Sequence, residues 1–217
     1  MPIRGRCRVI DHLEVLVEEL SMEVALRSVL PRIVPAVSFE IRVFQGKHDL
    51  LKQLGDRLRG YRGWLPTGMG IVVIVDRDEE DCLDLKEKLE KAARQAGFET
   101  RSASDGGRFQ VLNRIAVEEL EAWFFGDVAA VRKAYPRVPE SLGSHKAYRN
   151  PDAIKGGTAE ALERVLRGAG HFPGGLAKMR AAREISAHMD VENNQSRSFC
   201  EFRDGVRRLV NQKEEAR

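Results

Sequence analysis

The chain has 217 residues, with 36 basic against 33 acidic residues and a formal net charge of +3. Its 42% hydrophobic and 32% charged residues are typical of a globular protein and exclude a disordered chain. No stretch approaches the ~20 consecutive apolar residues of a bilayer span, so we expect no membrane partner. The first residues lack the apolar segment of a signal peptide, and three scattered cysteines make no disulfide framework. We therefore expect a cytoplasmic protein.

Charge is distributed unevenly along the chain. Residues 76–127 hold 14 acids and 8 bases, a net of −6, whereas residues 132–183 hold 11 bases and 4 acids, a net of +7. Residues 42–63 add 6 bases against 2 acids. An acidic centre between basic flanks suits a metal site that acts on a polyanion. Solvated helix faces that happen to be uneven are the alternative.

Strand and helix patterns alternate in the first half of the chain. Residues 12–19 alternate in polarity and predict a strand, after which Ser21 is expected to cap a helix. This helix is expected to run to about Leu30 and to be ended by Pro31 and Pro35. Residues 37–44 are rich in β-branched side chains and predict a second strand. Gly46 then precedes an amphipathic helix.

The strongest strand pattern is the continuous apolar run of residues 71–75, as expected for a central strand that is buried on both faces. Residues 82–96 carry a helical apolar stripe. Residues 98–104 and 109–115 predict two shorter strands, which the sequence Asp-Gly-Gly at 105–107 separates as a turn.

Helical patterns dominate after Val117, with apolar stripes over residues 176–189 and 199–210. The sequence therefore predicts an α/β fold, with a mainly parallel sheet flanked by helices and a C-terminal helical region. We expect the core domain in residues 1–127 and a basic helical region that packs on it in residues 128–217. We also expect both tryptophans, Trp64 and Trp123, in the core.

Asp76 and Asp78 directly follow the central strand, at the edge of a parallel sheet where ligands bind. Two carboxylates so close repel each other, and a divalent cation would relieve that repulsion. Helix capping is the alternative, because acids near a helix start favour its dipole. The four consecutive acids at 78–81 exceed what capping needs, which favours a metal site.

Other acidic and phosphate-binding motifs fit this sequence less well. A calcium EF-hand requires Gly at loop position six, where Asp81 stands, and a helix rather than a strand before the loop. No glycine-rich phosphate loop follows the first strand, so a dinucleotide site is not supported. In haloacid-dehalogenase-like phosphatases Thr or Val usually stands two residues after the Asp-x-Asp, where this chain has Glu80. An Asp-x-Asp glycosyltransferase remains an open alternative.

Two further acidic points each lie near the end of a predicted strand. The first comprises Glu18 and Glu19, at the end of the first strand, and Glu23 beyond it. The second comprises Glu118 and Glu121, whose spacing of three places them on one face of a predicted helix. Taken alone, this pair favours an exposed polar face. The three points together favour a shared site.

This combination of acids resembles the Toprim fold and, more closely, a prokaryotic Toprim-like family called domain of unknown function 4276. Glu18 matches the Toprim glutamate at the end of the first strand, and Asp76 and Asp78 match its Asp-x-Asp. Ser21 and Glu23 match the family's small hydroxyl residue and second acid.

The resemblance continues along the chain. Residues 118–124 resemble the family's acid-rich helix, and residues 148–152 and 196–199 extend the match. One departure is that Glu19 replaces the usual Gly, so Glu18 and Glu19 compete as the ligand.

The resemblance implies hydrolysis of phosphodiesters in DNA or RNA with Mg²⁺ or Mn²⁺, in phage defence or DNA processing and with a partner ATPase. It assigns Glu18, Asp76 and Asp78 as catalytic. The metal ligands would come from Glu18, Glu19, Glu23, Asp76, Asp78, Glu118 and Glu121. A topoisomerase would need a nucleophilic tyrosine, and none of the three tyrosines lies in such a pattern.

Basic side chains could hold a phosphate, and Lys47, Arg149 and Lys155 are the candidates, with simple solubility as the alternative for each. A second class of function is also open. In it the chain is a non-catalytic metal-binding, nucleic-acid-binding or regulatory subunit.

Overall fold

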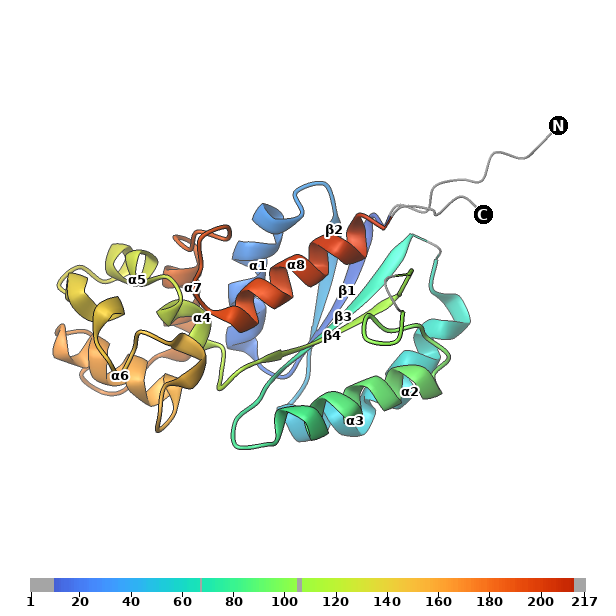
Figure 1. Ribbon diagram of the computed structural model, residues 1–217, viewed down its shortest axis with the longest axis horizontal. Coiled ribbons are helices and arrows are strands. Elements are labelled where there is room, and N and C mark those ends of the chain that lie inside the picture. Colours follow the sequence, from blue (N-terminus) through green and yellow to red (C-terminus); the bar gives the residue numbers. More distant parts are fainter. Residues whose placement is uncertain (1–9, 67, 105–106, 213–217) are drawn as a thin grey trace.

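The computed structural model describes residues 10–66, 68–104 and 107–212 (Figure 1). A four-stranded sheet of order β2-β1-β3-β4 forms its centre, and all three strand pairs are parallel. The strands are β1 (His12–Val17), β2 (Ser38–Val43), β3 (Met69–Asp76) and β4 (Val111–Ala116). The predicted α/β fold with a parallel sheet is confirmed, and it is consistent with a Toprim-like core.

Helices cover both faces of the sheet (Figure 1). One face carries α1 (Leu20–Ile33) and α8 (Arg197–Val210), and the other carries α2 (Lys47–Trp64) and α3 (Cys82–Gln95). The continuous apolar run of β3 serves both layers because successive side chains alternate between the faces. Val72 and Ile74 enter the core beneath α1 and α8, whereas Ile71, Val73 and Val75 enter the core beneath α2 and α3.

Four short helices gather beyond the carboxyl ends of the strands (Figure 1). They are α4 (Glu121–Phe125), α5 (Val128–Ala134), α6 (Thr158–Gly168) and α7 (Lys178–Ser186), with 3₁₀ turns η1 (Glu140–Ser144) and η2 (Pro151–Ala153). This helical layer therefore stands over the edge of the sheet where the predicted acidic site lies. In the described part of the chain, no helix is both long and apolar enough to cross a membrane.

The first helix departs from its predicted boundaries. It begins at Leu20 with Glu19 in the capping position, so Ser21 lies inside it, and Pro31 lies in its last turn instead of ending it. A proline there removes only one backbone donor near the helix end. The Arg32 guanidinium donates to the carbonyl of Met189 and thereby ties this last turn to the far end of the chain.

Two other predictions fail. Residues 98–104 form no strand and contribute a single bridge between Thr100 and Val111, while residues 105 and 106 of the predicted turn lie outside the described residues. Trp64 ends α2 with 59% of its surface exposed, whereas Trp123 is buried as predicted. The Trp64 ring lies edge-on to Tyr61 of the same helix, with ring centroids 5.5 Å apart, and a helical pattern alone cannot reveal whether another element covers it.

The segments around residues 148–152 and 196–199, both part of the resemblance, meet in the structure. The Asp152 carboxylate accepts hydrogen bonds from the hydroxyls of Ser196 (2.9 Å) and Ser198 (2.7 Å) and from the amide of Arg197 (2.6 Å). Trp123 Nε1 also donates to the Ser198 hydroxyl, at 3.1 Å. An acid at a helix N-terminus satisfies free amides and favours the dipole. The Asp152 contacts therefore fix the start of α8 against the helical layer.

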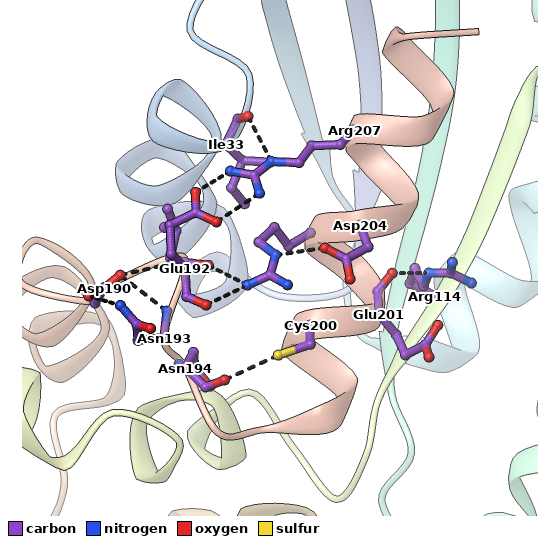
Figure 2. Close-up of polar contacts among 12 residues, drawn as sticks. Ile33, Arg114, Asp190, Glu192, Asn193, Asn194, Cys200, Glu201, Asp204 and Arg207 are labelled. Carbon is purple, nitrogen blue, oxygen red and sulfur yellow. Dashed lines mark hydrogen bonds and ion pairs between the residues drawn. The ribbon is translucent and has the colours of Figure 1, made fainter.

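A second network holds the loop before α8 (Figure 2). Arg203 Nη1 donates to the carbonyls of Val191 and Glu192, both at 2.9 Å. Arg207 forms an ion pair with the Glu192 carboxylate and donates to the carbonyl of Ile33 at 3.4 Å. The loop is thereby joined both to α8 and to the end of α1.

At Gly126, the end of α4 closely approaches the segment before α8. A Cβ at this position would lie 2.0 Å from Asn194 Oδ1 and 2.7 Å from the Ser196 amide nitrogen. We expect Gly126→Ala to lower the free energy of unfolding by about 1–3 kcal/mol through this overlap. Gly60→Ala is the control, because nothing lies within 4 Å of its Cβ and helix propensity favours Ala by up to about 1 kcal/mol. Urea unfolding measures both, and equal stability of the two variants would contradict the contact.

Candidate functional site

The ends of the two central strands bring the first acidic groups together. β1 and β3 are neighbours in parallel register, with Val17 opposite Ile74, so Glu18 follows β1 beside the last residues of β3. Glu18 Oε1 accepts a hydrogen bond of 2.7 Å from the amide of Asp76. Glu18 and Asp76 are therefore neighbours at the carboxyl edge of the sheet, and both are buried there.

Asp76 is the most enclosed acid of the site, with 5% of its surface exposed. Burial raises the pKa of its carboxyl group well above the usual value, and the negative charges of Glu18 and Glu121 raise it further. Within the described residues, its Oδ1 atom has no hydrogen-bond partner. A buried carboxylate oxygen without a donor is costly, which makes it a candidate ligand for a cation.

Glu121 reaches the same region from the first turn of α4. Only 1% of its surface is exposed, and its Oε2 atom has no hydrogen-bond partner among the described residues. Burial raises the pKa of Glu121 to about 7, with the charge of Lys178 opposing this shift and that of Glu119 adding to it. The expectation of an exposed polar face for Glu118 and Glu121 is wrong, because the helical layer covers this turn.

The pKa of Glu18 is also raised by burial. This pKa reaches about 7, although the bond from the Asp76 amide and the charge of Lys47 lower it. Asp78 and Glu19 act on it as further negative charges. The site is therefore a cluster of carboxylates that burial and mutual repulsion destabilise in their charged form.

Asp78 lies at a different depth from Asp76. Its side chain is 53% exposed, its backbone has a positive φ of 50°, and its Oδ2 lies 2.6 Å from Lys47 Nζ. Lys47 also donates to the carbonyl of Arg77 at 3.0 Å and pairs with Glu80 at 3.4 Å. The two acids of the Asp-x-Asp therefore differ in their partners. Asp78 is already paired with the Lys47 ammonium group, whereas Asp76 Oδ1 has no partner among the described residues.

The other predicted ligands divide into two groups. Glu19 caps α1, accepts a hydrogen bond from the Ser21 hydroxyl and contributes negative charge to the cluster. Glu23 instead pairs with Arg27 one turn along α1, at 2.7 Å. Glu118 does not share a helix face with Glu121, since it lies before α4 with a positive φ of 66° and pairs with Arg77.

Sequence reasoning missed two charged groups of the site. Lys178 begins α7, and its Nζ lies 3.9 Å from Glu119 Oε1. Burial lowers the Lys178 pKa, but the charges of Glu121 and Glu19 outweigh burial, so that its pKa lies above the usual value. Glu119 Oε2 accepts hydrogen bonds from Thr158 Oγ1 (3.1 Å) and the Ala159 amide (2.9 Å) at the start of α6. Neither contact has a local sequence signal, because each joins segments at least 39 residues apart.

A pocket of about 520 Å³ opens beside the cluster, and we call it the acidic pocket. Its lining combines backbone at Gly156 and Gly157 with six charged side chains: Arg77, Asp78, Glu79, Glu118, Glu119 and Glu160. The predicted phosphate ligands Arg149 and Lys155 are exposed and do not line it, whereas Lys47 contacts its Asp78.

The donor chemistry of the cluster fits a hard divalent cation. Its donors are carboxylate oxygens, which Mg²⁺ and Mn²⁺ prefer, and Asp76 and Glu121 each keep one oxygen without a partner in the described part of the chain. Among the described residues, however, no group of three or more His, Cys, Asp or Glu side chains is arranged to hold a metal ion. Metal binding would therefore require these side chains to move together or to bind partly through water.

Comparison with known proteins gives one match. The family model described as "Domain of unknown function (DUF4276)" matches residues 17–209, which include every residue of the carboxylate cluster. No curated protein and no solved structure matches the chain.

The raised pKa values predict how stability depends on pH. The pKa of Glu18 and Glu121 rises from 4.5 to about 7, so the folded protein binds more protons than the unfolded chain between these pH values. The free energy of unfolding should therefore fall as pH rises through this window. Glu18→Gln keeps an oxygen acceptor for the Asp76 amide and should weaken this fall.

Urea unfolding in EDTA buffer, at about pH 5 and about pH 8, measures the effect. Glu99→Gln is the matched control, because this side chain is exposed and the residue lies beside the start of β4, at the opposite edge of the sheet from the cluster. The expected result is a smaller difference between the two pH values for Glu18→Gln than for wild type and the control. Identical differences for all three proteins would contradict a buried charge at Glu18.

Proposed function

The chain belongs to the DUF4276 family, and we propose that its carboxylate cluster is the centre of a metal-dependent phosphodiester hydrolase that acts on nucleic acid. The observation that carries the proposal is Asp76, a carboxylate buried at the carboxyl edge of a parallel sheet with an unpartnered oxygen. Glu90, a buried acid of α3, also keeps one oxygen without a donor, but its other oxygen pairs with Lys86 at 2.9 Å, whereas no base pairs with Asp76 among the described residues. A site that takes up a cation leaves one oxygen available.

Glu18, Asp76 and Glu121 are the residues that would hold the metal, with Glu19 and Asp78 as further carboxylates nearby. When bound, Mg²⁺ or Mn²⁺ supplies an activated water and stabilises charge on the leaving oxygen. The hydrogen bond from the Asp76 amide fixes one oxygen of Glu18 and leaves its second oxygen for binding. Metal uptake would also remove the repulsion that raises the pKa values of these acids.

The two lysines next to the cluster would act on the substrate. Lys178 and Lys47 are both kept protonated by the surrounding carboxylates, because the pKa of each lies above its usual value despite burial. An ammonium group beside a metal can bind a phosphate oxygen and stabilise charge that develops during displacement. The sheet edge below and the helical layer above would exclude bulk water and strengthen both interactions.

A non-catalytic role is the second candidate, and Lys47 favours it. Its ammonium group is 2.6 Å from Asp78 Oδ2 and 3.4 Å from Glu80 Oε1, so it already neutralises part of the cluster. No three-ligand group is preassembled among the described residues. A site of this kind could bind nucleic acid or a metal without turnover.

Substitution of the two aspartates tests the catalytic proposal. Asp76→Asn and Asp78→Asn keep side-chain size but remove charge, so we expect both to lose Mn²⁺-dependent cleavage of plasmid, single-stranded DNA or RNA. Wild type should gain about 2.7 kcal/mol of stability at a metal concentration of 100 Kd, and the variants should gain much less. Without metal, Asp76→Asn should be at least as stable as wild type, since repulsion is relieved.

Asp56→Asn is the control, because Asp56 is an exposed acid on α2 that pairs with Arg59. It should retain both cleavage and stabilisation by Mn²⁺. Cleavage by the Asp76 and Asp78 variants at the wild-type rate would refute the site. Stabilisation of wild type by Mn²⁺ without cleavage of any substrate would favour the binding role.

Lys47 separates the two candidates further. Lys47→Met removes a positive charge that competes for Asp78, so Mn²⁺ should bind more tightly and the metal-free protein should lose stability. If Lys47 also contacts the phosphate, cleavage should fall although metal binding improves. Calorimetric titration with Mn²⁺ and a cleavage assay measure the two effects. Lys52→Met, one turn along α2 and exposed, is the control.

A further inference from the structure

A second pocket, of about 490 Å³, adjoins the acidic pocket and has the opposite charge. We call it the basic pocket. Lys146, Lys155 and Arg164 line it, and no acidic side chain does. Among the described residues, none of these three cations forms an ion pair, although many other surface bases of the chain do. Three unpaired cations around one cavity form a site for an anion.

The remaining walls of the basic pocket are apolar and aromatic. Ile154 is buried at its side, and the rings of His145 and Tyr148 lie 5.4 Å apart at an angle of 34°. Tyr148 is held in place by stacking on Phe125, with ring centroids 5.2 Å apart. An inorganic anion would bind to the cations but would leave the apolar and aromatic side chains of the pocket exposed to water. A ligand that combines a planar ring with a phosphate would contact both parts of the lining.

The two pockets meet at one loop. Lys155 lines the basic pocket, and the next two residues, Gly156 and Gly157, line the acidic pocket. Both glycines have positive φ values, 77° and 82°, and the Glu160 carboxylate lies against Gly157, where a side chain at this position would overlap it. Because adjacent Cα atoms are about 3.8 Å apart, neighbouring units of one polymer strand could reach both pockets.

We propose that the basic pocket binds one nucleotide of the single-stranded nucleic acid whose adjacent phosphodiester lies in the acidic pocket. This proposal rests on the proposed function and names the form of its substrate. Lys155 and Arg164 contact the phosphate, and the base packs against Tyr148, His145 and Ile154. Binding here requires no metal, because the pocket is itself positively charged.

Binding of a short fluorescein-labelled oligothymidylate in EDTA buffer, followed by fluorescence anisotropy at several salt concentrations, tests the proposal. Lys155→Glu combined with Arg164→Glu should weaken binding by about tenfold or more. The slope of log K against log salt should fall by about 0.7, because the two side chains neutralise one phosphate and each neutralised phosphate of a single strand contributes about 0.7. Lys91→Glu combined with Lys133→Glu is the matched control, since both lysines are exposed, lie outside the pocket and change the net charge equally. Equal weakening by the two double variants would overturn the proposal.

Competition experiments identify the ligand class. Thymidine monophosphate should displace the labelled strand better than inorganic phosphate or a poly-glutamate peptide, and His145→Ala should reduce this preference. Equal competition by inorganic phosphate or by the peptide would overturn the assignment to a nucleotide.

Asp76→Asn should bind the strand in EDTA at least as tightly as wild type, because the substitution removes a negative charge near the adjacent phosphodiester. Metal-free binding that depends on Lys155 and Arg164, in a protein that never cleaves, would leave this inference standing and refute only the hydrolase. Metal-dependent cleavage by a protein that shows no such binding would support the hydrolase and overturn this inference.

Discussion

The hydrogen bond from the Asp76 amide to the Glu18 carboxylate joins the ends of the two central strands, and the rest of the site is built around it. Parallel strands end at one edge of the sheet, so residues that follow β1 and those that end β3 become neighbours there. The same arrangement buries carboxylates next to one another, which raises the pKa of Glu18, Asp76 and Glu121. The fold therefore retains an unfavourable concentration of negative charge at the carboxyl edge of its sheet.

Two apolar layers provide the stability that permits such a site. β3 contributes buried side chains to both faces of the sheet, and α1, α2, α3 and α8 cover them. The acids lie at the end of this core rather than within it. Lys47 and Lys178 approach the cluster from α2 and α7 and partly neutralise it, so its net repulsion stays limited.

The C-terminal part of the chain does more than cover the core. The Asp152 carboxylate fixes the start of α8, and Arg203 and Arg207 fix the loop before it (Figure 2). With these contacts in place, the helical layer holds Lys178 and Glu119 beside the strand ends. It also forms the walls of the basic pocket. The segments that carried the sequence resemblance in this half thus have a structural role, the docking of α8.

The sequence by itself determined the parallel α/β core and the place of Glu18, Asp76 and Asp78, because hydrophobic periodicity and strand ends are local patterns. It did not determine the end of α1, where the Arg32 contact with Met189 carries the helix past Pro31. Nor did it distinguish the buried Glu121 from the paired Glu118, or find Lys178. Burial and charge pairing depend on which distant segments meet, and only the tertiary structure decides that.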